Sequence, residues 1–272
     1  MTMPDIATAA TALFVPGHRS DRYARAAASG AGFAIIDLED AVPAESKHDA
    51  RDAAVSALSD RRQEHRYAVR INAVDDGGVD DAHALAGTPG LLAVMVPKAE
   101  HGDGLRRIDD ALGGRIPLLP LVETAAGLGA LNDIARAPRV ARLAFGAYDF
   151  AADIGTSDPR VLDHSRIALV LASRQEHLRA PLDSPDAEFR DLEVVRRGAR
   201  NARALGFTGK LCIHPAQLEV AGREFLPSLD EVEWAQRVLA AQTDGATSVD
   251  GAMVDRPVRL RAEAILARQE GL

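Results

Sequence analysis

Eight short apolar segments, each of strand length, recur along the 272-residue chain and constrain its fold more than any other feature. Most are continuously apolar, which is typical of strands covered on both faces, and most precede a stretch of helical character. Eight alternations favour an α/β fold of the (β/α)8 TIM-barrel type over an open doubly wound sheet, and no G-x-G-x-x-G motif supports a dinucleotide fold. The segments are residues 12–17, 33–40, 67–72, 92–98, 117–123, 142–149, 180–183 and 209–215.

Two further helices are expected after the eighth segment. They cover "SLDEVEWAQRVLAAQ" (228–242) and "DRPVRLRAEAILARQ" (255–269), and the turn-rich "TDGATSVDGAM" joins them. We find no sequence repeat and no interdomain linker. The expected organisation is a barrel domain over residues 1–224 with a C-terminal extension over residues 225–272.

Composition narrows the class of protein. A hydrophobic content of 47% supplies a full core, and a formal net charge of −8 argues against a nucleic-acid partner. The single cysteine, Cys212, excludes an intrachain disulfide and a cysteine-rich metal site. The N-terminal residues lack a signal-peptide pattern, and no apolar run approaches the roughly 20 residues of a membrane helix. A cytoplasmic protein without a membrane partner is expected.

Polar side chains close nearly every predicted strand. In a barrel of this type the carboxyl ends of the strands carry the chemistry, so these side chains are the candidate site. Glu123 directly follows "LLPLV", where an ionised carboxylate costs several kcal/mol unless a cation pairs with it or the strand has reached solvent. The candidates are Glu39, Asp40, Arg70, Asn72, Lys98, Glu123, Asp149 and His214.

Glu123 and Asp149 close consecutive predicted strands, so their carboxylates are expected to be neighbours. A divalent cation would relieve both their repulsion and their burial, and two oxygen ligands without nearby histidine or cysteine suit Mg²⁺ or Mn²⁺. The alternative is that each carboxylate pairs with an arginine.

Arg70, in "YAVRIN", is placed to hold a planar carboxylate through two parallel hydrogen bonds. The alternative is a salt bridge to Glu39 or Asp40. Lys98 could be a ligand group or a solvated strand end, and His214, in "CIHPAQ", is expected to cap the turn into the next helix.

With these residues in place, the chain resembles the HpcH/HpaI aldolase/citrate lyase family, and within it the CitE-like acyl-CoA lyases. The matching stretches follow in order over nearly the whole chain. They are "LFVPGHRSDR", "DLEDAVPAESK", "VRIN", "VPKAE", "LVETAAG", "FGAYDFAADIG", "GKLCIHPAQ" and "GAMVDRP".

The resemblance implies a TIM barrel with Mg²⁺, or Mn²⁺ in its place, held by Glu123 and Asp149. It further implies that the substrate carboxylate lies near Arg70, Glu123 and Glu39, and that a CoA thioester crosses the barrel mouth near two basic residues. Arg70 and Glu123 are then catalytic as well as substrate-binding residues. The two basic residues are Arg19 and Lys47.

Asp255, in "MVDRPVRL", has two interpretations. Pro257 and a helical stretch follow it, so it can serve as a helix N-cap. The resemblance implies instead that the C-terminal extension reaches the barrel mouth of a neighbouring subunit, in a homotrimer or hexamer, where Asp255 would be a catalytic acid.

The implied reaction is Mg²⁺-dependent cleavage of a carbon–carbon bond in a carboxylated 3-hydroxyacyl-CoA. A malyl-, citramalyl- or citryl-CoA type of ester would give an acyl-CoA and an α-keto acid. The alternatives are a thioesterase or synthase on the same site, and a citrate lyase beta-type subunit that acts on an acyl group held by a carrier protein.

Overall fold

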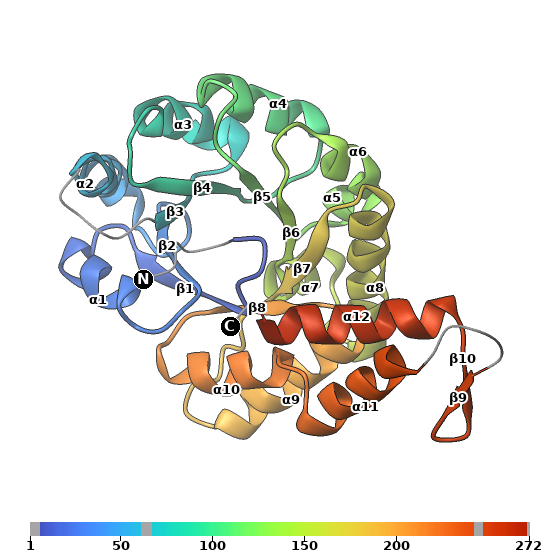
Figure 1. The fold of residues 1–272 in the computed structure, drawn as a ribbon. Helices are drawn as coiled ribbons and strands as arrows, with labels where there is room; N and C mark the ends of the chain where they lie inside the picture. The colour runs from blue at the N-terminus through green and yellow to red at the C-terminus, as the bar shows by residue number, and fades with distance from the viewer. Residues whose placement is uncertain (1–5, 61–66, 242–246, 271–272) are drawn as a thin grey trace. The chain divides into compact units, whose positions relative to one another are not determined.

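The computed structural model describes residues 6–60, 67–241 and 247–270 (Figure 1). Contacts between Cα atoms divide the chain into two compact units, Met1–Gly222 and Arg223–Leu272, and each is described by itself. Within the described residues, no helix combines the length and apolar character needed to cross a bilayer.

The first unit is a closed barrel of eight parallel strands in the order β1 to β8, so the predicted fold class is confirmed. β1 pairs with both β2 and β8, which closes the sheet on itself. All eight predicted apolar segments form strands, although most strands end before the polar residues that close the segment. The strands are β1 (Thr11–Pro16), β2 (Phe33–Asp37), β3 (Tyr67–Arg70), β4 (Leu91–Val96), β5 (Leu118–Val122), β6 (Arg142–Phe145), β7 (Arg179–Asp183) and β8 (Gly209–Cys212).

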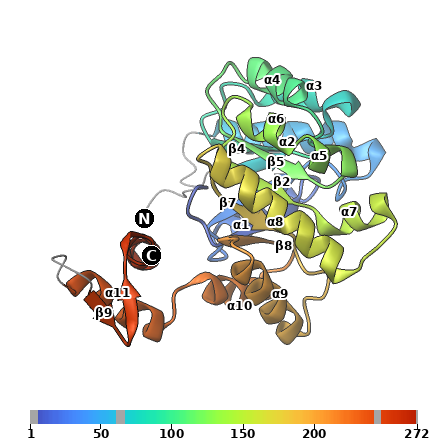
Figure 2. The same cartoon turned by 90° about the vertical axis from the view of Figure 1, so that its right-hand side faces the viewer.

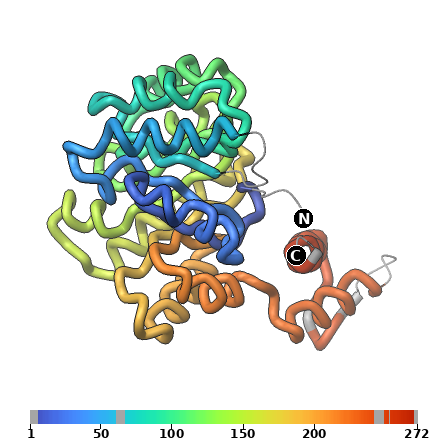
Figure 3. The backbone as a smooth tube through the Cα atoms, turned by 90° about the vertical axis from the view of Figure 1, so that its left-hand side faces the viewer, coloured from blue at the N-terminus to red at the C-terminus, as the bar shows by residue number. Residues whose placement is uncertain are grey.

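Every strand of the barrel is followed by at least one helix. Figures 2 and 3, which view the chain from opposite sides, show these helices on the outside of the sheet. The α-helices are α1 (Tyr23–Ala27), α2 (Lys47–Ser59), α3 (Val79–Leu85), α4 (Gly102–Ala111), α5 (Ala125–Gly129), α6 (Leu131–Arg136), α7 (Ala147–Ile154), α8 (Pro159–Gln175), α9 (Leu192–Ala204) and α10 (Ala216–Phe225). Three shorter turns of helix are η1 (Ser20–Arg22), η2 (Ala44–Ser46) and η3 (Val74–Gly78).

Alternate residues of the strands fill the barrel interior, as the period of two in a strand requires. One buried cluster holds Ile35 of β2, Ala68 of β3 and Leu121 of β5. The residue two positions further along each strand therefore points to the same inner side, at the carboxyl end. These residues are Asp37, Arg70 and Glu123.

The amino end of the barrel is closed by Arg142, the first residue of β6, which is fully buried. Its guanidinium donates to the backbone carbonyls of Ala9 at 2.7 Å and Ala180 at 2.6 Å, and to the hydroxyl of Thr208 at 2.9 Å. These bonds tie the segment before β1 to β6, β7 and the turn before β8. The hydrogen bonds of Arg142 thus close the end of the barrel opposite the candidate site and stabilise the fold there.

The second unit consists of α11 (Leu229–Ala240), α12 (Arg256–Glu270) and a two-stranded hairpin. The two predicted helices are confirmed, but the hairpin, β9 (Thr247–Val249) and β10 (Ala252–Val254), lies where only turns were expected. Its turn residues Asp250 and Gly251 both have positive φ, at 52° and 79°. Residues 242–246 of the predicted turn lie outside the described residues.

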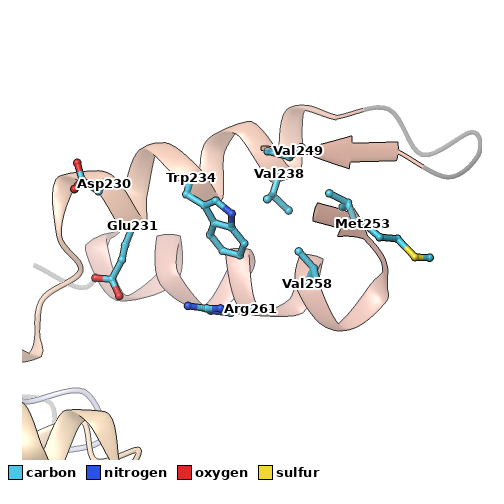
Figure 4. A pocket seen from close by; sticks show the side chains of 9 residues that line it. Asp230, Glu231, Trp234, Val238, Val249, Met253, Val258 and Arg261 are labelled. Atoms are coloured by element: carbon cyan, nitrogen blue, oxygen red, sulfur yellow. The ribbon is translucent and has the colours of Figure 1, made fainter. Parts of the chain in front are cut away.

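An apolar groove lies between the helices and the hairpin of the second unit (Figure 4). The guanidinium of Arg261 lies 5.0 Å from the centre of the Trp234 ring, a cation–π contact at one side of the groove. The other lining residues are Asp230, Glu231, Val238, Val249, Met253, Val254 and Val258.

Candidate active site

Arg70 is the centre of a buried ion-pair network at the carboxyl end of the barrel. Its Nε donates to Oδ1 of Asp37 at 2.7 Å and its Nη2 to Oδ2 at 2.6 Å, which is the bidentate geometry of a strong pair. Nη1 faces Glu39 Oε2 at 3.1 Å and Asp40 Oδ2 at 3.2 Å. Burial disfavours the charged guanidinium, but the bond to Asp37 and the charges of the three acids raise the pKa of Arg70.

Asp37 is a site residue that the sequence did not single out. Besides Arg70, its two oxygens accept hydrogen bonds from the backbone N–H groups of Glu39 at 2.9 Å and Ala41 at 3.2 Å. It therefore fixes both the arginine and the loop after β2. The sequence analysis singled out Glu39 and Asp40. Asp37, however, lies two residues after the inward-facing Ile35 on the same strand, so its side chain points to the same inner side of the barrel.

Lys98 joins two of the buried acids. Its ammonium forms a short ion pair with Oε1 of Glu39, and its backbone N–H donates to Oε1 of Glu123 at 2.8 Å. Lys98 has φ 45°, in the left-handed region that non-glycine residues rarely adopt. The loop after β4 thus adopts a strained backbone that brings one residue to both glutamates. Lys98 is exposed to solvent and its ammonium is paired with Glu39, so the structure does not decide between a ligand group and a solvated strand end.

Glu123 is the most unusual acid of the site. Its side chain is buried, with a residue exposure of 1%, and its Oε2 has no hydrogen-bond partner among the described residues. Burial raises the pKa of this carboxyl to about 8; the Lys98 N–H and the Arg70 charge lower it, while the charges of Glu39 and Asp149 raise it. An ionised Glu123 therefore requires a further positive partner.

Asp149 is not at the end of a strand, as the sequence analysis placed it. β6 ends at Phe145, and Asp149 lies in the first turn of α7 with its side chain exposed to solvent. The spacing prediction was wrong because a glycine turn and the start of a helix intervene. The two carboxylates nevertheless lie close enough for the charge of Asp149 to raise the pKa of Glu123.

The donor set fits a hard divalent cation. The described residues contain no group of three histidine, cysteine, aspartate or glutamate side chains that could hold a metal by themselves. Glu123, with one unpartnered buried oxygen, and Asp149, which is exposed, are two oxygen donors of the kind that Mg²⁺ takes together with water or substrate oxygens. Burial raises the pKa of both Glu39 and Glu123, the two buried acids nearest Lys98, so a divalent ion bound there would stabilise their ionised forms.

Arg19 and Lys47, the two basic residues expected near CoA, both follow strands at the carboxyl end of the barrel. Arg19 is held by Asp21 through two hydrogen bonds of 2.9 and 2.8 Å. The ammonium of Lys47 donates to the backbone carbonyls of Leu38 at 2.7 Å and Glu39 at 2.5 Å. Lys47 therefore also supports the loop that carries Glu39.

The remaining candidates make local hydrogen bonds within this chain. Asn72 donates its side-chain and backbone N–H groups to Asp81 of α3, at 2.7 and 2.9 Å. His214 Nδ1 accepts from the N–H of Ala216 at 3.2 Å, which confirms the predicted cap of the turn. Asp255 Oδ1 accepts from the N–H of Val258 at 3.1 Å, so it is the N-cap of α12.

Comparison with known proteins agrees with this geometry. The model of the HpcH/HpaI aldolase/citrate lyase family matches residues 10–215. A citrate lyase subunit beta-like protein of Deinococcus radiodurans is 36% identical, with 94% of this chain and 96% of that protein covered. The chain therefore belongs to the HpcH/HpaI aldolase/citrate lyase family.

Relatives with different names share this similarity. A (3S)-malyl-CoA thioesterase of Cereibacter sphaeroides is 32% identical over 96% of this chain and 94% of its own length. The human mitochondrial citramalyl-CoA lyase is 31% identical, with 92% of this chain and 82% of that protein covered. Among solved structures, CitE of Mycobacterium tuberculosis in complex with magnesium, acetoacetate and coenzyme A superposes with a TM-score of 0.84 at 36% identity, covering 97% of this chain and 99% of that one.

Metal binding at Glu123 should depend on pH. Because the pKa of the metal-free carboxyl is about 8, Mg²⁺ must displace a proton at lower pH, and its affinity should fall as pH drops below that value. Calorimetry in buffers of different ionisation enthalpy should detect release of roughly one proton at about pH 6.5 and little above about pH 9.

The same pKa predicts the stability of the metal-free protein. The folded pKa lies above the unfolded value, so the stabilisation is complete below about pH 4.5 and is lost as pH rises through about 8. Thermal unfolding in EDTA should show this loss in the wild type, and Glu123→Gln should remove it. Glu233→Gln, at an exposed glutamate of α11, is the matched control and should retain it. An identical pH profile for wild type and Glu123→Gln would contradict the assignment.

Proposed function

We propose that this protein is a Mg²⁺-dependent carbon–carbon lyase that cleaves a carboxylated 3-hydroxyacyl-CoA of the malyl-, citramalyl- or citryl-CoA type. The products are an acyl-CoA and an α-keto acid. The observation that carries the proposal is the buried, unpartnered Oε2 of Glu123, whose carboxyl is bonded by the Lys98 N–H and feels the charges of Asp149 and Arg70. The names of the relatives and the magnesium and coenzyme A in the CitE complex support the same chemistry.

Glu123 and Asp149 would hold the metal. When bound, Mg²⁺ supplies a Lewis acid that favours loss of the hydroxyl proton and polarises the carbonyl oxygen of the α-keto acid. The chain's own part is to keep Glu123 buried and oriented, which the backbone N–H of Lys98 does through Oε1 while leaving Oε2 for the ion.

Arg70 would bind the substrate carboxylate with the end of its guanidinium that Asp37 leaves available. Asp37 occupies Nε and one side of Nη2, so a second carboxylate can approach across Nη1 and Nη2. Glu39 and Asp40 both lie at Nη1, at 3.1 and 3.2 Å. The Asp40 side chain is 57% exposed and can turn into solvent, which leaves room for the substrate beside Glu39. Glu39 would remain beside the substrate, held by Lys98.

The bond-breaking step moves two protons. The substrate hydroxyl would lose one to Glu39, which lies beside the substrate, as its C–O bond becomes the keto carbonyl. The electrons of the carbon–carbon bond would pass to the α-carbon of the thioester. That enolate gains a proton from an acid placed over the α-carbon. We propose Asp255 of a neighbouring subunit for this role, in a homotrimer or hexamer. Among the described residues, the cap bond from Val258 uses only Oδ1 of Asp255.

We propose that the CoA arm runs over the loops after β1 and β2. Arg19 is the phosphate contact that fits best, because it is solvent-exposed in part and its present partner, Asp21, is itself an exposed residue of 62% side-chain exposure. Lys47 would support the CoA site indirectly, because its ammonium holds the loop after β2 through the carbonyls of Leu38 and Glu39. A CoA-ester substrate and a chain with one buried cysteine both suit a cytoplasmic location.

The reaction can be tested with the purified protein, Mg²⁺ and malyl-, citramalyl- and citryl-CoA. Mass spectrometry should detect glyoxylate and acetyl-CoA from malyl-CoA, and EDTA or Glu123→Gln should abolish their formation. Malate with free CoA would identify a thioesterase instead, as the name of the Cereibacter relative suggests. Inactivity on every free CoA ester, with activity on an acyl carrier protein, would favour the beta-subunit alternative.

Arg70→Lys should lower turnover by about tenfold or more, equivalent to at least ~1.4 kcal/mol of transition-state stabilisation. Lysine keeps the charge but cannot bond Asp37 and a substrate carboxylate at the same time with a planar fork. Steady-state kinetics on the best CoA ester measures the loss. Arg106→Lys, on the outer helix α4, is the control and should behave as the wild type. Normal kinetics for Arg70→Lys would place the carboxylate contact elsewhere.

Asp255 can be tested by subunit mixing. Asp255→Ala and Glu123→Gln should each be inactive alone, whereas subunits exchanged between them should regain activity. Each restored site would combine one intact barrel with one intact extension. Native mass spectrometry confirms that mixed oligomers have formed. If they form and remain inactive, Asp255 acts within its own chain or only as a cap.

A further inference from the structure

Ser184, directly after β7, joins two strands at the point where α7 begins. Its side chain is buried, with a residue exposure of 2%. The hydroxyl donates to the backbone carbonyl of Phe145 at 2.7 Å and accepts a short hydrogen bond from the N–H of Ala147. One side chain therefore satisfies the last carbonyl of β6 and the first N–H of α7.

Gly146, between these two residues, is held from the other side by β5. Its N–H donates to the carbonyl of Val122 at 3.0 Å, and its own carbonyl accepts from Phe150 of α7 at 3.0 Å. A Cβ on Gly146 would lie 2.5 Å from Oε2 of Glu123 and 2.6 Å from its Cβ, so only glycine fits. The turn from β6 to α7 is thus packed directly on the glutamate whose oxygen lacks a partner.

This arrangement determines where Asp149 lies. Gly146 is the N-cap of α7 and has no side chain to cap the helix, so Ser184 bonds the N–H of Ala147 from the neighbouring strand. Asp149 is two residues further on, in the same first turn. The start of α7 therefore has one anchor on β5, beside Glu123, and one on Ser184.

We propose that Ser184 is a positioning residue for the divalent cation, because it fixes the first turn of α7 and hence the separation of Asp149 from Glu123. The inference rests on the metal site of the proposed function. Ser184 itself does not touch the ion. Its hydroxyl acts through the backbone, since both of its hydrogen-bond partners are main-chain groups.

The test is the affinity for Mn²⁺, measured by electron paramagnetic resonance on the purified chain without substrate. Ser184→Ala should weaken binding by about tenfold or more, in the range typical of residues that orient metal ligands. Hydrogen exchange at the amides of Ala147 to Phe150 should become faster in the same variant, because the anchor of the first turn is lost.

Two controls separate positioning from general loss of stability. Ser173→Ala removes the hydroxyl of another buried serine, on α8, whose Oγ has no hydrogen-bond partner among the described residues. Thr208→Val removes an acceptor of Arg142 at the opposite end of the barrel and should lower the melting temperature. Both variants should bind Mn²⁺ as the wild type does.

The outcomes are distinct. If the wild type binds Mn²⁺ and Ser184→Ala binds it equally well, the positioning role is wrong while the metal site stands. If the wild type does not bind Mn²⁺, the metal site of the proposed function fails, and the role of Ser184 with it. Should Ser184→Ala not fold, Ser184→Cys keeps the size of the side chain with a weaker hydrogen bond, and the same comparison of affinity decides.

Discussion

The buried carboxylate of Glu123 is the constraint around which the mouth of the barrel is built. Burying an ionised carboxylate without a cation costs several kcal/mol, and the two cations nearby already serve other acids. Arg70 is held by Asp37, and Lys98 by Glu39. The chain therefore leaves one oxygen unsatisfied in a place where an added divalent ion would remove the cost. The rest of the fold must therefore supply enough stabilisation to offset the free-energy cost of burying Glu123.

That stabilisation comes from elsewhere in the barrel. A parallel sheet with a period of two brings Asp37, Arg70 and Glu123 to the same end, each two residues beyond an apolar residue of the interior. The opposite end is closed by Arg142, whose donors are used on backbone carbonyls and a hydroxyl. The mouth thus contains the buried acids and the ion pairs that hold them, whereas the opposite end is closed by hydrogen bonds to backbone groups. The strained backbone of Lys98 and the raised pKa of Glu123 both lie at the mouth.

The fold could be predicted because a continuously apolar segment indicates a strand that is buried on both faces, and this pattern can be recognised in the local sequence. Glu123 and Arg70 could be found for the same reason, as polar residues that end such segments. Asp37 carries the same signal, two residues after Ile35 at the end of β2, but the sequence analysis passed over it. Ser184 could not be found in this way, since its role depends on the turn at Gly146 in another part of the barrel. Asp149 was displaced from its predicted strand end because the run "RLAFGAYD" hides the change from strand to helix. The hairpin of the second unit was missed although "VDGA" carries a two-residue turn signal at Asp250 and Gly251.

The relatives include one protein named as a lyase and one named as a thioesterase. Both names refer to a CoA ester, and the two reactions differ in what must reach that ester. Carbon–carbon cleavage needs an acid over the α-carbon, whereas hydrolysis needs water at the thioester carbonyl. The inner half of the mouth, Glu39 and Glu123, is buried in the barrel itself, but Asp40 and Asp149 in the outer half are exposed. As the described residues form it, the outer half of the mouth is therefore open to water, which is the reactant that hydrolysis needs.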